Sequence, residues 1–232
     1  MPVPAPPPLR ASLVIDYQNV HLTGHELYDS TRHLPKHETI VQPLLFAQAM
    51  LKERNARQRP PDRGGRAAVL SRVLVYRGLP SADHDQVGNA MNLAQASEWT
   101  KDLRVHVTLR PLKYYYERDA AGNIRKEING VGIYSRVAEK GVDVLCALAV
   151  LREAIRDDID VVVLCSSDSD LAPAIEEGRL LNTAKIETFS WWNGAAKGKR
   201  GHWIKVAPPV WNTRLDEATY NQVIDRTTYS PL

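Results

Sequence analysis

The chain has few cysteines, and this scarcity excludes two common kinds of site. Cys146 and Cys165 are the two cysteines among 232 residues, and each lies inside an apolar stretch. Two cysteines without a nearby histidine pattern form neither a disulfide framework nor a zinc site. We therefore expect both residues to be buried, reduced thiols.

Long apolar runs and a leader pattern are also missing. No run reaches the roughly 18 apolar residues that a membrane-spanning helix needs, so none is expected. The start, MPVPAPPPLR, lacks the basic and apolar regions of a secretory signal, and we expect residues 1–10 to form a disordered proline-rich tail. These features predict a cytoplasmic protein. Its composition, 44% hydrophobic and 25% charged, is typical of a globular domain.

Short apolar runs alternate with helical patterns along most of the chain. The segments 12–15 and 160–165 are continuously apolar, which is typical of strands buried on both faces of a parallel sheet. Other expected strands are 67–76, 103–112, 185–191 and 202–207, and expected helices are 38–54, 81–99, 140–158, 170–181 and 216–226. The alternation predicts an α/β fold with a mostly parallel central sheet.

Carboxylates follow the two most apolar strands. SLVIDYQNV stops at Asp16, and VVVLCSSDSDLAP stops at Asp168 with Asp170 two residues later. Asp143 lies near the start of the helix that precedes the second strand, and such a helix begins at the same sheet edge. Because binding sites of open parallel sheets lie beyond the carboxyl ends of the strands, we expect these acids to converge. Four carboxylates in one pocket need a compensating cation, and Mg²⁺ or Mn²⁺ suits oxygen ligands.

Each of these residues also has an ordinary structural explanation. Asp170 is a suitable helix N-cap, and Asp168 can close an Asx turn. Asn19 can cap a helix, and Asp143 can complement a helix N-terminus. Their joint occurrence at matching strand ends is what favours a functional site.

The segments VIDYQNV, KGVDVLCAL and VVVLCSSDSDLAPAIEEG resemble the three signature blocks of the NYN family, PIN-like ribonucleases related to the LabA-type proteins. The first resembles the family's D-x-x-N, the second its K-G-x-D-V and the third its S-G-D-S-D-[FL]-x-P. The three blocks, in the family's order, fall within residues 11–190. The resemblance implies a PIN-like (Rossmannoid) α/β/α sandwich and a metal-dependent endoribonuclease that hydrolyses RNA phosphodiester bonds at an acidic site.

The resemblance also implies roles for individual residues. Asp16, Asp143 and Asp168 match the positions that hold Mg²⁺ or Mn²⁺ and act in catalysis. Asp170 matches the second acid of the third block, and we expect it to act in catalysis with them, as an added ligand or an outer-shell acid. Asn19 matches the asparagine that supports the first aspartate, and we group it with the substrate-binding residues.

The resemblance sets the expected domain boundaries. The NYN/PIN-like domain is expected at residues 11–207, with a hairpin insertion at 112–133. Residues 208–232 are expected to form a C-terminal extension. The sequence leaves open a homodimer, with the hairpin as one contact, and a regulatory protein partner.

Two positions depart from the family pattern. The usual glycine of the third block is Ser167 here. A further aspartate that many relatives have, about two turns into the second-block helix, corresponds to Ala149. The second departure leaves open an alternative function, a catalytically weakened RNA-binding or regulatory module.

Basic and aromatic residues follow the strand expected at 185–191. Phosphates are usually contacted by Lys and Arg, and unpaired bases stack on aromatic rings. We therefore expect RNA to be bound by Trp191, Trp192, Lys197, Lys199 and Arg200. The alternative is that a tryptophan packs in the core and the cations only solvate a loop.

Overall fold

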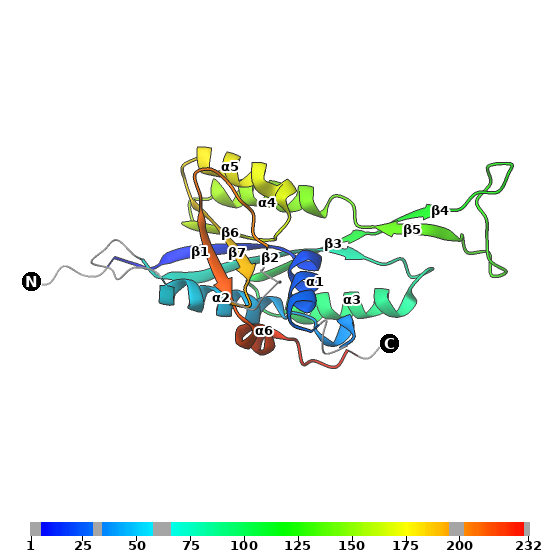
Figure 1. The fold of residues 1–232 in the computed structure, drawn as a ribbon, viewed down its shortest axis with the longest axis horizontal. Coiled ribbons are helices and arrows are strands. Elements are labelled where there is room, and N and C mark those ends of the chain that lie inside the picture. The colour runs from blue at the N-terminus through cyan, green and yellow to red at the C-terminus, as the bar shows by residue number, and fades with distance from the viewer. Residues whose placement is uncertain (1–5, 30–33, 58–65, 195–201, 230–232) are drawn as a thin grey trace, which may run out of the picture.

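A six-stranded, all-parallel sheet forms the centre of the protein, with helices on both faces (Figure 1). The computed structural model describes residues 6–29, 34–57, 66–194 and 202–229. The strands are β1 (Leu9–Asp16), β2 (Ala68–Leu79), β3 (Val105–Pro111), β4 (Lys113–Tyr116), β5 (Tyr134–Ala138), β6 (Val161–Cys165), β7 (Lys185–Trp191) and β8 (Trp211–Leu215). The helices are α1 (Tyr17–Tyr28), α2 (Pro43–Arg57), α3 (Gln86–Trp99), α4 (Val142–Ala154), α5 (Ala172–Leu180) and α6 (Glu217–Val223), with 3-10 turns η1 (Lys36–Glu38) and η3 (Ser169–Leu171). The predicted α/β fold is confirmed.

The sheet separates two cores. Its strand order is β3-β2-β1-β6-β7-β8, and α4 and α5 cover one face while α1, α2, α3 and α6 lie on the other (Figure 1). Side chains alternate along β1, so Leu13 and Ile15 join the core under α1, α2 and α6, and Val14 joins the core under α4 and α5. All five residues of β6 are buried, which explains its continuous apolar run.

The ends of the domain differ from their expected boundaries. β1 begins at Leu9, which pairs with Ala68 of β2, and Asp160, just before β6, accepts hydrogen bonds from Arg10 N and Nε at 2.7 and 3.0 Å. Residues 202–207, which were expected to form a strand, have no regular secondary structure, and the last strand of the described chain is β8. Leu215 of β8 is fully buried.

The segment 208–232, expected as an extension, supplies part of the sheet and the core. β8 pairs with β7 in parallel, and Tyr220 of α6 is fully buried. The Tyr28 hydroxyl donates to Leu215 O at 3.1 Å and ties α1 to this segment. Residues up to 229 therefore belong to the same folded unit.

The expected hairpin is an antiparallel ribbon that projects from the body (Figure 1). It runs from Lys113 to Ala138, five residues beyond its expected end at 133. Near its tip, Asp119 Oδ1 accepts from Ala121 N and Asn123 N, both at 2.9 Å, and these bonds close a turn.

In the described part of the chain, no helix has the length and apolar character needed to cross a membrane. Cys146 and Cys165 are both buried and free, as expected.

Candidate functional site

The strand order reverses between β1 and β6, and this reversal positions the site. The chain builds β2 and β3 outward on one side of β1, and then β6, β7 and β8 outward on the other. Loops that diverge in this way leave a crevice beyond the carboxyl ends of the two central strands. β1 pairs with β6 through Ile15 and Cys165, so Asp16 and the turn that follows Cys165 lie at this point.

Asp16 is a buried carboxylate, with only 7% of its surface exposed. The Ser166 hydroxyl donates to its Oδ2 at 3.0 Å, and Asn19 N donates to its Oδ1 at 3.3 Å. The pKa of Asp16 is raised to about 6, chiefly by burial and also by the carboxylates of Asp168 and Asp143, and the two hydrogen bonds oppose this rise. Asp143 and Asp168 are therefore each within electrostatic reach of the Asp16 carboxyl.

Asn19 and Ser167 join the first and third sequence blocks. Asn19 Oδ1 accepts from Ser167 N at 2.8 Å and from Ser167 Oγ at 3.0 Å. The backbone bond needs no particular side chain, and the serine adds a second bond that a glycine cannot make. The amide oxygen of Asn19 thus positions the loop after β6, and Ser167 is compatible with this arrangement.

The loop after β6 is held by its own aspartate. Asp168 Oδ1 accepts from Asp170 N at 3.0 Å and caps η3, which confirms the expected Asx-type turn. Asp170 is exposed, and the N-cap of α5 is Leu171, so Asp170 does not cap this helix. Asp168 is half-buried, whereas Asp170 is exposed to solvent.

Glu139 is an acidic residue of the site that the sequence reasoning missed. Gly78 N, at the end of β2, donates to its Oε2 at 2.5 Å. The pKa of Glu139 is raised to about 7, chiefly by burial and also by the charges of Asp16 and Asp143, while the Gly78 hydrogen bond and the Arg77 charge oppose this rise. Its position directly before Lys140 and Gly141 in the second block was the available signal, but the residue lay between the hairpin and the expected helix.

Helix α4 presents Asp143 to the site and Ala149 to the core. Asp143 is exposed in the first turn, where its charge complements the helix N-terminus. Ala149 is fully buried in the core under α4 and α5, and it lies six residues later, about 240° around the helix. An alanine there does not remove a charge from the site. Cys146, one turn after Asp143, lies closer to the acidic residues than Ala149 does. Burial and these carboxylates raise the pKa of its thiol, which stays protonated.

The carboxylates form an incomplete metal cage. Among the described residues, no three Asp, Glu, His or Cys side chains are arranged to hold one ion, so the expected trio of Asp16, Asp143 and Asp168 is not a preformed three-ligand set. Mg²⁺ usually binds proteins through one or two carboxylates and keeps several waters. Asp16 and Asp168 are oxygen donors of this kind at one crevice, and the raised pKa of Asp16 shows that its charge is poorly compensated. The donor set therefore fits a partly hydrated Mg²⁺ or Mn²⁺.

The two adjacent tryptophans have different environments. Trp191 is 2% exposed, and its Nε1 donates to Val20 O at 2.8 Å, so its ring is part of the core and cannot stack on a base. The expectation that Trp191 binds substrate is therefore wrong, because Trp191 is the last residue of β7 and its side chain packs in the core. Trp192 is partly exposed, with the Arg214 guanidinium 4.6 Å from its ring centroid.

The predicted basic contacts lie outside the described residues. These are Lys197, Lys199 and Arg200.

A described cluster of basic and aromatic residues lies nearby in the sequence. The Arg214 guanidinium is 5.7 Å from the ring centroid of Trp203, and Lys205 Nζ is 5.6 Å from the same centroid. Trp192, Trp203, Lys205 and Arg214, which we call the tryptophan–arginine cluster, lie beside the carboxyl ends of β7 and β8, the sheet edge that also bears Asp16.

Comparison with known proteins gives no family. No family model matches the chain, and no curated protein matches it. The chain is similar to the crystal structure of a protein of unknown function from Vibrio parahaemolyticus RIMD 2210633, with 18% identity, 82% of this chain and 84% of that chain covered, and a TM-score of 0.41. That similarity is too weak to support an inference about function. The chain thus has an α/β fold with an all-parallel six-stranded sheet flanked by helices, and its place in the NYN family stays a prediction.

Proposed function

We propose that the chain is a divalent-metal-dependent endoribonuclease of the NYN type, acting in the cytoplasm. The observation that carries this proposal is the gathering of Asp16, Glu139, Asp143 and Asp168 around the switch point of the sheet, with Asp16 buried. These acids come from the ends of β1, β5 and β6 and from the first turn of α4. The three segments that resemble the family's blocks supply three of the four.

The charges of this cluster favour a hard cation. The pKa values of Asp16 and Glu139 are raised to about 6 and about 7, chiefly by burial and also by the charges of nearby aspartates. Ionising both at neutral pH without a counter-charge is unfavourable, and oxygen-binding Mg²⁺ or Mn²⁺ supplies that charge. Asp16 and Asp168 are the residues that would hold it. A cation there supplies Lewis-acid stabilisation of the negative charge that develops on a phosphodiester.

The same sheet edge offers groups that suit RNA. The tryptophan–arginine cluster combines partly exposed indole rings with a guanidinium, and such rings stack on unpaired bases. Arg214 and Lys205 can contact phosphates. Ser166, Ser167 and Asn19 keep Asp16 and the loop of Asp168 in fixed relative positions.

The test is cleavage of a labelled single-stranded RNA by the purified full-length chain in EDTA, Mg²⁺ or Mn²⁺. We expect cleavage with either metal and none in EDTA. Asp16→Asn should abolish cleavage while the protein stays folded, and Asp158→Asn should leave it unchanged, because Asp158 is an exposed acid paired with Arg156 at 2.8 Å. Equal cleavage by wild type and Asp16→Asn would contradict the proposal.

A second function is favoured by one observation, the absence of a three-carboxylate arrangement in the described residues. A catalytically weakened RNA-binding or regulatory module would keep the tryptophan–arginine cluster without needing a metal. Calorimetric titration with Mn²⁺, beside an RNA-binding measurement, separates the two. RNA binding without Mn²⁺ binding would favour the module, and Mn²⁺ binding that is lost in Asp16→Asn favours the nuclease.

A further inference from the structure

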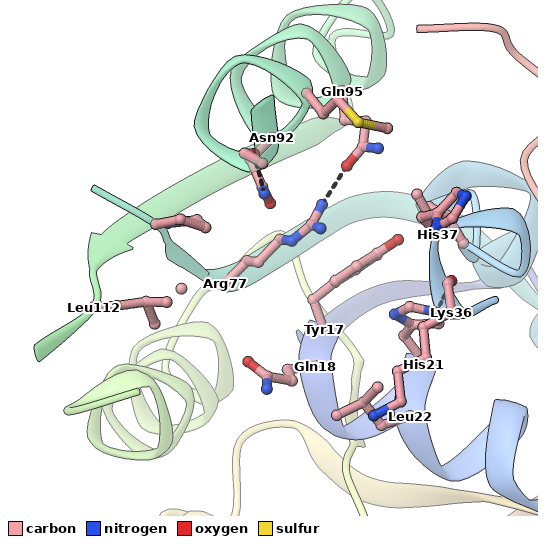
Figure 2. Close-up of a pocket in the computed structure, with 15 residues that line it drawn as sticks. Tyr17, Gln18, His21, Leu22, Lys36, His37, Arg77, Asn92, Gln95 and Leu112 are labelled. Carbon is pink, nitrogen blue, oxygen red and sulfur yellow. Dashed lines mark hydrogen bonds between the residues drawn. The ribbon is translucent and has the colours of Figure 1, made fainter. Parts of the chain in front are cut away.

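A pocket of about 290 Å³ lies beside the acidic site, between α1, α3 and the end of β2 (Figure 2). Small-ligand pockets typically measure about 300–1,000 Å³, so this one lies at the lower end and suits a ligand no larger than a single nucleotide. Gly78, whose N–H holds the Glu139 carboxylate, lines the pocket, and so does Tyr17, which directly follows Asp16. A ligand bound in the pocket therefore lies next to the acidic site.

Arg77 gives this pocket a positive charge. Its Nη1 donates to Gln95 Oε1 at 2.5 Å, and its guanidinium carbon lies 4.6 Å from the ring centroid of Tyr17 (Figure 2). Both partners are neutral, and within the described residues Arg77 forms no salt bridge; the Glu139 charge acts on it only at longer range. A guanidinium held by neutral groups keeps its charge for an anionic ligand, and its planar fork suits phosphate.

Asn92 adds an unsatisfied hydrogen-bond acceptor. Its side chain is 8% exposed and extends from α3 toward Arg77 (Figure 2). Its Nδ2 donates to Gly88 O at 2.6 Å, and its Oδ1 has no hydrogen-bond partner in the described part of the chain. Buried acceptors are nearly always paired, so this oxygen indicates a donor that arrives with a ligand.

Lys36 adds a second cation to the lining, and the other walls are mostly apolar (Figure 2). Leu22, Met91 and Leu112 offer surface for a flat ring. Burial lowers the pKa of His21 to about 4, so its imidazole is uncharged at neutral pH. Two cations, Arg77 and Lys36, one free acceptor and apolar walls match a nucleotide, which has a phosphate, hydroxyl or N–H donors, and an aromatic base.

We propose that this pocket binds one nucleotide of the RNA chain, with a phosphate on Arg77 and a hydroxyl or base N–H on Asn92 Oδ1. This inference rests on the proposed ribonuclease function, which places RNA at the adjacent acidic site. The pocket holds the nucleotide next to the one that is cleaved, and it positions the scissile phosphate through the continuity of the RNA backbone.

The test is binding of AMP, CMP, GMP and UMP to the full-length protein in EDTA, measured by calorimetry or NMR titration. We expect at least one nucleotide to bind, and Arg77→Met to weaken that binding by tenfold or more. Arg104→Met is the matched control: Arg104 pairs with Asp102 at 2.8 Å away from the pocket, and we expect an affinity within twofold of wild type. Met91→Phe, which fills the pocket at a partly exposed position of α3, should also weaken binding.

Three outcomes would overturn the inference. They are no binding of any of the four nucleotides, binding by Met91→Phe equal to wild type, and inorganic phosphate binding as tightly as the best nucleotide. Arg77 also packs near Trp99, 5.8 Å from its ring centroid, so Met91→Phe decides the question if Arg77→Met does not fold. Because these titrations contain no metal, they do not depend on metal binding at the acidic site, and Met91→Phe separates binding in the pocket from binding at the tryptophan–arginine cluster. Mn²⁺-dependent cleavage reports separately on the proposed function.

Discussion

Asp16 and Ser166 are 150 positions apart in the chain, and the Ser166 hydroxyl donates to Asp16 Oδ2 at 3.0 Å. The same hydroxyl accepts from Asp168 N at 3.1 Å. One buried side chain thus links the ends of the two central strands and the loop that positions Asp168. Because the hydroxyl donates to the charged form of Asp16, it also favours ionisation of that carboxyl.

Replacing this serine should therefore have a pH-dependent effect. Ser166→Ala removes the donor, so we expect the pKa of Asp16 to rise above about 6. The loss of stability should be greater at pH 8, where Asp16 is ionised, than at pH 4.5, with a total of about 1–3 kcal/mol, as for a hydrogen bond to a charged group. Urea denaturation at both pH values measures it.

Ser190→Ala is the matched control for Ser166→Ala. Ser190 is also buried, and its hydroxyl donates to the neutral amide oxygen of Asn212 at 2.8 Å. Its replacement should cost a similar or smaller amount of stability, with no difference between pH 4.5 and pH 8. Equal pH dependence in the two variants would show that Ser166 does not act through the Asp16 charge.

The buried Asp16 carboxyl should make the metal-free protein less stable as the pH rises. Its pKa is about 6 in the folded protein, against an ordinary 3.8, so between these values the folded state binds more protons than the unfolded state. Stability therefore falls as the pH rises from about 4 to 6, by an amount on the order of 3 kcal/mol from this group. Asp16→Asn removes that contribution, so we expect the variant to gain stability over wild type at pH 8 but not at pH 4.

Denaturation curves of wild type and Asp16→Asn in EDTA at pH 4 and pH 8 measure this difference. Added Mn²⁺ should raise the stability of wild type at pH 8 and should have little effect on the variant, since the ion binds the folded state through Asp16. A pH-independent difference between the two proteins would mean that Asp16 titrates at its ordinary value.

The sequence predicted the parts of this site that follow from strand order. Asp16 and Asp168 both come after continuously apolar runs, and strands of that kind are central in a parallel sheet, so their ends meet. Glu139 could not be predicted in the same way. It reaches the site because Gly78 N, 61 positions earlier, holds its carboxylate, and pairing between a side chain and a distant backbone group leaves no pattern in a sequence.

The helical and basic residues were harder to place. Ala149 was aligned with a family position by counting turns, but the direction of a side chain changes by about 100° per residue, and the structure places it in the core. Arg54 is the last residue of the helix expected at 38–54, and nothing in its sequence context indicates that its charge is buried. Its side chain is instead buried against Glu187, a residue of β7 whose burial the strand pattern did not reveal.

The Arg54–Glu187 pair should be important for stability. Arg54 Nε and Nη2 donate to the two Glu187 oxygens at 2.7 and 2.8 Å, and both side chains are at most 1% exposed. Arg54→Met leaves the buried Glu187 charge with only Lys185 Nζ at 2.9 Å, so we expect a loss of about 3–5 kcal/mol. Replacing both partners by methionine should restore part of that loss, because no uncompensated charge remains.

Arg57→Met is the control for this prediction. Arg57 pairs with Glu53 one turn earlier on α2, and both side chains are substantially exposed, at 46% and 33%. Exposed pairs of this kind contribute about 0.3–0.5 kcal/mol, so the control should unfold almost as wild type does in urea. Similar losses for Arg54→Met and Arg57→Met would contradict the interpretation that burial makes the first pair important.

Trp191 and Trp192 are adjacent in the sequence, and we expect their replacements to have opposite consequences. Trp192→Leu removes a partly exposed ring that packs on Arg214. Base stacking is worth about 1–3 kcal/mol per base, so the affinity for single-stranded RNA should fall by fivefold or more.

Trp191→Leu removes a core ring 5.0 Å from that of Phe189, together with its hydrogen bond to Val20 O. This replacement should lower the stability of the fold by about 3 kcal/mol or more. Fluorescence anisotropy with a labelled RNA and urea denaturation measure the two effects, and any Trp191→Leu protein that remains folded should bind RNA as wild type does. Unchanged RNA affinity in Trp192→Leu would exclude the tryptophan–arginine cluster as an RNA contact.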